Sequence, residues 1–350
     1  MPVVTQKKGK SRADSSQEDG PEAAIPLGKQ LAHTDKKVRD KAVESLVAFL
    51  SQGGDAEGKS STYVKLEEKE MSKLWKGLFY CFWMSDKPLV QQRLAADLAE
   101  LVLQINPRST SSADSFQASL AFLEGFWDAM VREWAGLDRL RMDKYYMLIR
   151  KYISATFRLL AREKWEKKAV ESANKVLMKK GGAMSWEDPK VPTSIATHLS
   201  DIYLEELDKV LGLPEVDSQP ACPLITVLDP HLTLLARTSR AVIHTRLMSS
   251  IFEPLLTSLS LASPVSISDE EPPSKRSRTL KEKPMYAHIV MHSCTGETGK
   301  QNRSKPDALR QGVLKAMFNA AANGKATETN RRKIYTIWRQ EGGDDEEDDE

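Results

Sequence analysis

The sequence predicts an all-α fold in which antiparallel helical pairs stack side by side, as in an α-solenoid. Apolar residues recur with helical spacing in one segment after another, and short polar loops separate these segments. No run alternates between apolar and polar residues as a half-buried strand would. Because no repeat of about 34 or 40 residues is evident, a compact helical bundle remains the alternative architecture.

The most informative element is a helix expected from about Leu66 to Met84. It follows a polar stretch at 1–25, a first helix capped by Thr34 or Asp35, and a loop at 51–62. This helix is apolar nearly all round, so we expect it to be buried nearly all round at the centre of the fold. Its large core residues are expected to be Trp75, Phe79 and Trp83.

The remaining elements follow from caps, breaks and apolar stripes. Ser85 or Asp86 is expected to cap the next helix, with Pro88 in its first turn and Ile105 near its end. Four later helical segments are expected, at 115–135, 137–179, 192–211 and 227–261. The second of these is expected to be divided or bent, and the last to be interrupted near Pro230 and Pro254.

Composition divides the chain into five parts. We expect a disordered basic tail, a helical domain, a disordered basic linker, a docking segment and a disordered acidic tail. These parts are 1–25, 26–262, 263–284, 285–340 and 341–350. Within the docking segment, 306–322 reads as a helix and Tyr286–Met291 as a short strand or extended piece.

Charge and cysteine content limit the function classes. The net charge is +2, but residues 344–350 are all acidic, and without those seven residues the remainder carries +9. A basic body favours polyanionic partners. The three cysteines are far apart in sequence, which favours a reducing compartment, and neither a signal peptide nor a membrane span is evident. We expect an intracellular, soluble protein.

No motif for catalysis, cofactor binding or metal binding stands out. His288, His292 and Cys294 lie close in sequence, but no further ligand completes a zinc site, so surface histidines are the simpler interpretation. No nucleophile motif or phosphate-binding loop fits its required context. The expectation is a protein that is not an enzyme, with no cofactor and no small-molecule substrate.

Basic residues supply the candidate binding sites. Spacings of 7, 7 and 4 place Lys144, Lys151, Arg158 and Arg162 on one helical stripe, which we interpret as an RNA phosphate contact. A solvated face with internal ion pairs is the alternative. A basic cluster in the linker indicates nuclear import, and residues 7–12 form a second cluster. The import residues are Lys275, Arg276 and Arg278.

The segment 330–339 mixes cations with large apolar side chains. We expect it to dock onto a surface, either of this chain or of a partner. The docking residues are Arg331, Arg332, Tyr335 and Trp338.

Four segments resemble the nucleolar ribosomal-RNA-processing protein 1 family, which consists of assembly factors of the large ribosomal subunit. They are LAHTDKKVRDKAVESL (31–46), LWKGLFYCFWMSDKPLVQQRLAADLAEL (74–101), FWDAMVREWAGLDRLRMDKYYMLIRKY (126–152) and NRRKIYTIW (330–338). The resemblance implies a HEAT-like helical domain, residence in the nucleus and nucleolus, and a non-enzymatic role in maturing precursor ribosomal RNA. It implies precursor ribosomal RNA and other assembly factors as partners, and no catalytic residues.

Two hypotheses follow. In the first, the protein is a scaffold that touches both ribosomal RNA and other assembly proteins in the pre-60S particle. In the second, it is a helical protein–protein adaptor in the nucleus with no direct RNA contact. Salt-dependent RNA binding by the isolated protein separates the two.

Overall fold

The computed structural model describes residues 26–53, 64–107, 112–216, 219–263, 283–296 and 303–341. Helices dominate these residues, so the all-α prediction is confirmed. The α-helices are α1 Leu27–Leu31, α2 Lys36–Gln52, α3 Glu68–Trp83, α4 Pro88–Gln104, α5 Ser112–Glu133, α6 Arg139–Arg162, α7 Lys167–Met178, α8 Thr193–Leu211, α9 Leu224–Arg237, α10 Ala241–Leu247, α11 Glu253–Ala262, α12 Ala287–His292, α13 Pro306–Ala322 and α14 Glu328–Gln340. The short elements are the 3-10 turns η1 Trp134–Gly136 and η2 Pro214–Val216, the π-helical turn η3 Met248–Phe252, and the strands β1 Cys222–Pro223 and β2 Ser293–Cys294.

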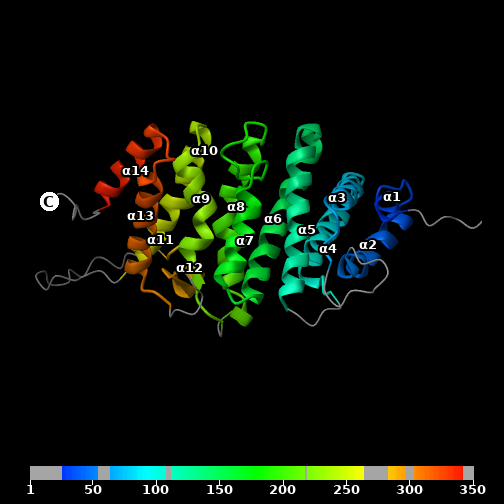
Figure 1. Ribbon diagram of the computed structural model, residues 1–350. Coiled ribbons are helices and arrows are strands. Elements are labelled where there is room, and N and C mark those ends of the chain that lie inside the picture. The colour runs from blue at the N-terminus through cyan, green and yellow to red at the C-terminus, as the bar shows by residue number, and fades with distance from the viewer. Residues whose placement is uncertain are drawn as a thin grey trace, which may run out of the picture.

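The helices form two layers, and from α1 to α10 each helix packs against the helix two places along the chain, after which α9 packs against α13. One layer runs α1, α3, α5, α7, α9 and α13, and the other runs α2, α4, α6, α8 and α10. Figure 1 shows the resulting array, with the N-terminal helices at one end and α13 and α14 at the other. This arrangement is that of a helical solenoid. Within the described residues, no helix is both long and apolar enough to cross a membrane.

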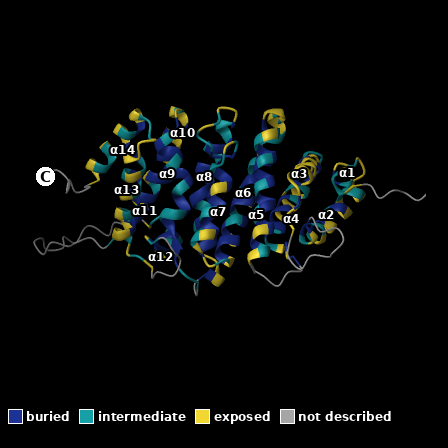
Figure 2. Cartoon of the chain, in the orientation of Figure 1, coloured by how far each residue is buried: buried dark blue, intermediate teal, exposed yellow. Residues whose placement is uncertain are grey.

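One hydrophobic core runs the length of the array, from Leu31 to Ile334. Figure 2 shows the buried residues where neighbouring helices face each other and the exposed residues toward the helix ends. The C-terminal helices α12, α13 and α14 belong to this same core through Ile289, Leu309 and Ile334.

Only eight of the 16 residues of α3 are buried, so the expectation that this helix is buried nearly all round is wrong, and it lies toward one end of the array rather than at its centre. Trp75 is 1 % exposed and its ring lies 4.6 Å from that of Phe122 on α5. Gly125 permits this approach, because a Cβ there would lie 2.3 Å from the Trp75 ring. Phe79 is also buried, whereas Trp83 is only half-buried, so the expectation that Trp83 lies in the core is wrong.

The predicted helix starts are partly right. The Asp35 carboxylate accepts a hydrogen bond from the Lys37 amide and caps α2. Pro88 occupies the first turn of α4, but the residue before it, Lys87, provides no side-chain cap. Ser85 instead donates its hydroxyl to the Phe82 carbonyl and closes the end of α3. The sequence prediction missed the short α1.

The division expected within 137–179 falls between α6 and α7. Lys164 and Trp165 adopt φ angles of 55° and 56° there, a left-handed conformation that is unfavourable for residues other than glycine. The Trp165 side chain is completely buried, and its amide donates to the Leu160 carbonyl. Burial of a large ring therefore accompanies the strained turn that ends α6.

Two segments of the C-terminal half differ from the structure that the sequence predicts. The segment expected to be extended, Tyr286–Met291, is mostly helix α12, and only the following β2 is extended, pairing in parallel with β1. Helix α9 continues through Pro230, whereas Pro254 follows the wide turn η3. A proline lacks an amide hydrogen, so a local π turn before Pro254 accommodates it within the helical run. The helix predicted at 306–322 is confirmed as α13.

Candidate interaction surface

The outer side of α6 carries three of the four cations predicted to contact RNA. Lys151, Arg158 and Arg162 are exposed on this helix. The expectation that Lys144 shares their surface is wrong, because its side chain is buried at 6 % exposure. Lys144 points from α6 in nearly the same direction, but the turn between α3 and α4 covers it.

Lys144 instead caps the C-terminal end of α3 from its position on α6. Its ammonium donates to the carbonyl oxygens of Phe82, Trp83 and Ser85 at 3.0, 2.7 and 2.9 Å. The last carbonyls of a helix have no partner within the helix, and a cation there is also favoured by the helix dipole. Burial lowers the pKa of Lys144 to about 8. This lysine joins the start of α6 to the end of α3.

The three exposed cations differ in how strongly neighbours hold them. Arg158 forms two hydrogen bonds to the carboxylate of Glu100 on α4, at 2.6 and 3.2 Å. Arg162 binds Glu163 at 3.1 Å and the Leu103 carbonyl at 3.1 Å. Lys151 forms no hydrogen bond or ion pair with any described residue.

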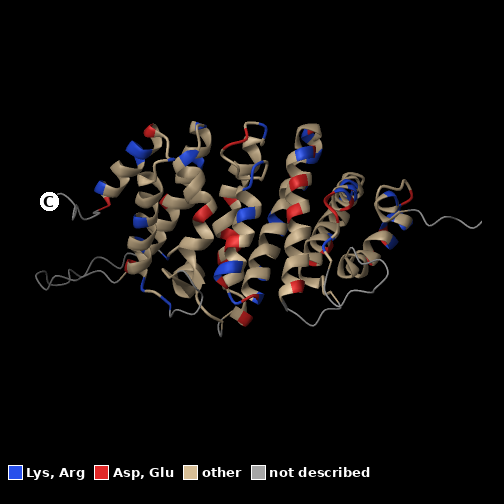
Figure 3. Ribbon diagram, viewed as in Figure 1, with Lys and Arg blue, Asp and Glu red and all other residues tan. Residues whose placement is uncertain are grey.

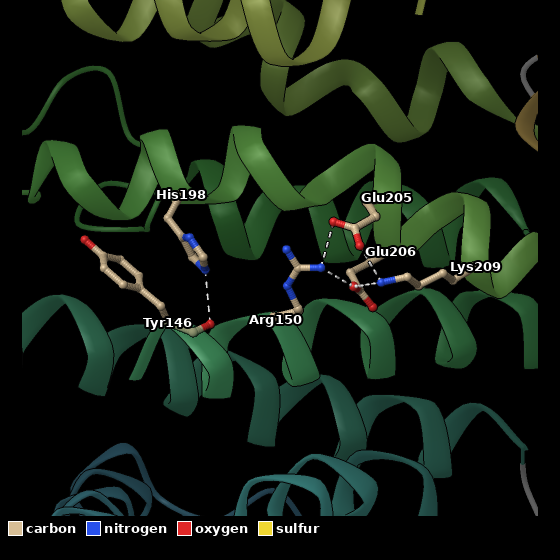
Figure 4. Close-up of polar contacts among 6 residues, drawn as sticks. All are labelled: Tyr146, Arg150, His198, Glu205, Glu206 and Lys209. Atoms are coloured by element: carbon tan, nitrogen blue, oxygen red, sulfur yellow. Dashed lines mark hydrogen bonds and ion pairs between the residues drawn. The ribbon is translucent and has the colours of Figure 1, made fainter. Parts of the chain in front are cut away.

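On its other side α6 is joined to α8 by an ionic network. Figure 4 shows the Arg150 guanidinium reaching two carboxylates of α8, at 2.8 Å from Glu205 and 2.9 Å from Glu206. Lys209 lies 2.6 and 3.0 Å from the same two carboxylates. Burial alone would lower the pKa of Arg150, but the hydrogen bonds and charges of both glutamates outweigh it and raise the pKa. These charges pair with one another and hold α6 against α8.

An aromatic contact continues the junction between α6 and α8. The Tyr146 ring lies 4.3 Å from the His198 ring, and His198 Nε2 lies 3.1 Å from the Tyr146 carbonyl oxygen. Figure 4 shows this pair beside the ionic network. Burial lowers the pKa of His198. The neutral imidazole therefore belongs to the packing of the two helices.

Charges of both signs are mixed along the visible face of the array in Figure 3. The α6 surface is therefore less basic than the sequence alone indicated, because Glu100 lies opposite Arg158. One sequence offers no signal for that pairing, since the two residues lie on different helices.

The predicted docking segment forms α14 and docks onto this chain's own helices. Tyr335 and Trp338 contact Phe318 of α13, and Arg331 donates to the Ala321 carbonyl at 3.3 Å. Arg332 is exposed and pairs with Glu328. Whether these four residues also bind a partner stays a prediction.

Sequence reasoning missed the residue that attaches α14 most directly. The Asn330 side chain is buried and donates to the carbonyls of Leu235 and Thr238 at 3.0 and 2.8 Å, which closes the end of α9. Thr327 caps α14 by accepting a hydrogen bond from the Asn330 amide. The spacing of Thr327 and Asn330 at the start of a helical pattern was the available signal.

The import residues Lys275, Arg276 and Arg278, and the cluster 7–12, lie outside the described residues. Within the described residues, no group of three or more His, Cys, Asp or Glu side chains is placed to hold a metal ion.

Two leucines near helix N-termini lie almost entirely in solvent. Leu140, the second residue of α6, is 93 % exposed, and Leu89, the second residue of α4, is 79 % exposed. Trp83 lies nearby, with the Arg141 guanidinium 4.6 Å from its ring. Large apolar side chains that are exposed to this degree are candidates for contact with a protein partner.

Comparison with known proteins gives the family. A family model described as nucleolar protein Nop52 matches residues 22–337. The human ribosomal RNA processing protein 1 homolog B is 35% identical over 234 residues, which cover 67% of this chain and 28% of the human protein. The human homolog A is 28% identical over 339 residues, covering 90% of this chain and 69% of that protein. A Drosophila melanogaster homolog is 36% identical over 142 residues, covering 41% of this chain and 19% of the fly protein.

The chain thus spans less than a third of human homolog B. The resemblance inferred from the sequence motifs is confirmed by both the family model and the named relatives. Since the family model covers most of its length, this chain belongs to the Nop52 family of nucleolar proteins.

Proposed function

We propose that this chain is a non-enzymatic nucleolar assembly factor that binds large-subunit pre-ribosomal particles and supports the processing of precursor ribosomal RNA. The observation that carries the proposal is the family match over 22–337, together with relatives that are named ribosomal RNA processing proteins. A long helical array with one continuous core supports it, because such an array offers extended surfaces to several partners at once.

In this proposal the outer side of α6 contacts ribosomal RNA through Lys151, Arg158 and Arg162. Lys151 is the cation most available to a phosphate, since it has no partner among the described residues. Arg158 and Arg162 already have protein partners, so an RNA phosphate would share or displace them. The test is to crosslink RNA to the tagged protein in purified particles and to map the crosslinked peptides. Crosslinks between α6 and precursor ribosomal RNA support the proposal. If no peptide of this chain is crosslinked, direct RNA contact is contradicted.

The second candidate is a helical protein–protein adaptor in the nucleus that makes no RNA contact. The exposure of Leu89 and Leu140 favours it, because apolar side chains gain more from a protein partner than from a phosphate backbone. The crosslinking experiment separates the candidates. An adaptor would co-purify with assembly proteins after nuclease treatment and yield no RNA crosslinks.

We also propose that the linker cluster Lys275, Arg276 and Arg278 acts as a nuclear import signal, with residues 7–12 as a second one. A fluorescent fusion with both clusters changed to alanine or serine is expected to lose nuclear accumulation. The partner proteins are depleted in the same cells, so that import on a partner is removed. A normal nucleolar signal under these conditions would contradict the assignment.

A further inference from the structure

The last helical hairpin, α13 and α14, brings three aromatic rings together on its surface. The Phe318 ring stacks against that of Tyr335 with centroids 5.0 Å apart, and the Trp338 ring lies 5.1 Å from Phe318. All three side chains are half-buried, so each ring keeps part of its surface in contact with solvent. In Figure 2, α14 is drawn mostly as exposed or intermediate.

The polar atoms of these rings are not used by the fold. In the core, the Trp75 indole donates to a carbonyl of α5 at 3.1 Å, and the Tyr152 hydroxyl donates to a carbonyl of α4 at 2.9 Å. By contrast, neither Tyr335 nor Trp338 makes a hydrogen bond to any other described residue, and neither has a buried unpaired atom. The Trp338 indole N–H and the Tyr335 hydroxyl therefore face water and can pair with a ligand.

The hairpin is also strongly basic. Residues 303–341 contain nine Lys or Arg and three Asp or Glu, a net charge of +6. Lys315 lies one turn before Phe318 on α13, and Arg332 and Arg339 lie about one turn on either side of Tyr335 on α14. All three cations are exposed. Figure 3 shows blue residues along this end of the array with few red ones.

The aromatic rings are not the only attachment of α14 to the array, although Tyr335 and Trp338 pack against the edge of the core. Asn330 closes the end of α9 through its side chain, and Ile334 is buried in the main core. These two residues lie on the opposite side of α14 from Arg332 and Arg339. Since Asn330 and Ile334 also attach the helix, the exposed parts of the three rings remain open to a ligand.

We propose that the outer surface of the α13–α14 hairpin binds single-stranded RNA. Bases stack on the half-exposed rings of Phe318, Tyr335 and Trp338, while Lys315, Arg332 and Arg339 contact the phosphates. Proteins that bind single strands combine aromatic platforms with a basic surface in this way, since every base has a face that can stack. The site lies at the opposite end of the array from α3 and does not involve α6, but it rests on the proposed function in requiring an RNA partner.

The test measures binding of an oligouridylate of about 12 nucleotides to the full chain. Replacing Tyr335 and Trp338 with leucine keeps apolar contact with Phe318 but removes the stacking faces, and we expect at least about tenfold weaker binding. Replacing Arg332 and Arg339 with glutamine should lower the slope of log affinity against log salt by about 1.4, or about 0.7 for each lost phosphate contact.

A matched control removes two exposed cations at the far end of the array, through Lys69→Gln with Lys73→Gln on α3. This pair should leave the affinity nearly unchanged. Ultraviolet crosslinking provides an independent readout, because uridine stacked on these rings should attach to the tryptic peptide 334–339. If the leucine pair disturbs folding, the arginine pair still tests the site, since the Arg332 side chain is 79% exposed and pairs with Glu328 at the helix surface.

The outcomes separate this inference from the proposed function. If the wild-type chain binds RNA and both hairpin variants bind equally well, the hairpin site is overturned while RNA contact through α6 stands. If the wild-type chain binds no RNA, both RNA contacts are overturned. If the hairpin variants lose binding to polyglutamate but not to oligouridylate, the ligand is an acidic protein segment and the RNA assignment is wrong.

Discussion

The ammonium of Lys144 lies 2.7 Å from the carbonyl oxygen of Trp83, so a cation on α6 closes the end of α3. Sixty-one residues separate the two in sequence, and the bond therefore fixes how the first part of the array meets its middle. Its two companion bonds reach the carbonyls of Phe82 and Ser85.

The first prediction concerns this contact. Lys144→Met keeps the apolar stem of the side chain but leaves three carbonyls without their donor, and we expect it to cost about 2–3 kcal/mol of unfolding free energy. Chemical denaturation followed by circular dichroism measures the loss. Lys151→Met, on the exposed part of the same helix, is the matched control and should change stability by less than about 0.5 kcal/mol. Equal effects of the two substitutions would refute the structural role of Lys144.

The second prediction compares two tryptophans of α3. Trp75→Ala removes a ring that is buried among Phe122, Phe126 and Tyr152, and it should cost about 3–5 kcal/mol. Trp83→Ala should cost less, because the ring is half-buried and one of its faces meets the Arg141 guanidinium. Thermal and chemical unfolding of both variants test the order. A larger loss for Trp83→Ala would mean that the core of α3 lies elsewhere.

Helical periodicity predicted the direction of side chains but not what covers them. Lys144 and Lys151 do point from α6 in nearly the same direction, as their spacing of seven requires, yet only Lys151 reaches solvent. The difference arises from the turn after α3, which comes from a segment about 60 residues earlier. The pairing of Arg158 with Glu100 is likewise a contact between helices, and spacing within one helix carries no information about it.

Elements with strong local signals were predicted more accurately. The segment 306–322 begins with a proline suited to the first helical turn and matches α13 at both ends. By contrast, Tyr286–Met291 contains residues that favour strands, but this stretch packs against α8 and α11 as the helix α12. Tertiary packing overrides a weak local preference in so short a segment.

The third prediction concerns acid stability. His231 is completely buried with neither ring nitrogen hydrogen-bonded to a described residue, and burial lowers its pKa to about 3. The unfolded chain, with a histidine pKa of about 6.5, binds this proton first, so stability falls as the pH drops from about 6.5 toward 3. Because of this histidine, the free energy of unfolding should be about 2 kcal/mol lower at pH 5 than at neutral pH.

His231→Phe removes this titration while keeping a ring against Tyr203, whose centroid lies 4.1 Å away. Denaturation at pH 7 and pH 5 should show the variant losing about 2 kcal/mol less than the wild type between the two conditions. His33→Gln near the start of α2 serves as the control and should follow the wild type. An identical pH dependence of the wild type and His231→Phe would show that His231 does not carry the effect.

The last prediction tests the α6 surface as an RNA contact. Changing Lys151, Arg158 and Arg162 together to glutamine should lower the slope of log affinity against log salt by up to about 2, since each phosphate contact on a single strand contributes about 0.7. The variant should stay folded, because glutamine is a good helix former. Glu100→Gln provides the opposite test. It frees Arg158 from its carboxylate partner, so RNA affinity should rise if Arg158 meets a phosphate. The measurement is a salt titration of RNA binding by the wild type and both variants. If all three give the same slopes and affinities, RNA does not bind at α6. The exposed apolar residues Leu89 and Leu140 then become the stronger reason to regard this chain as a protein adaptor.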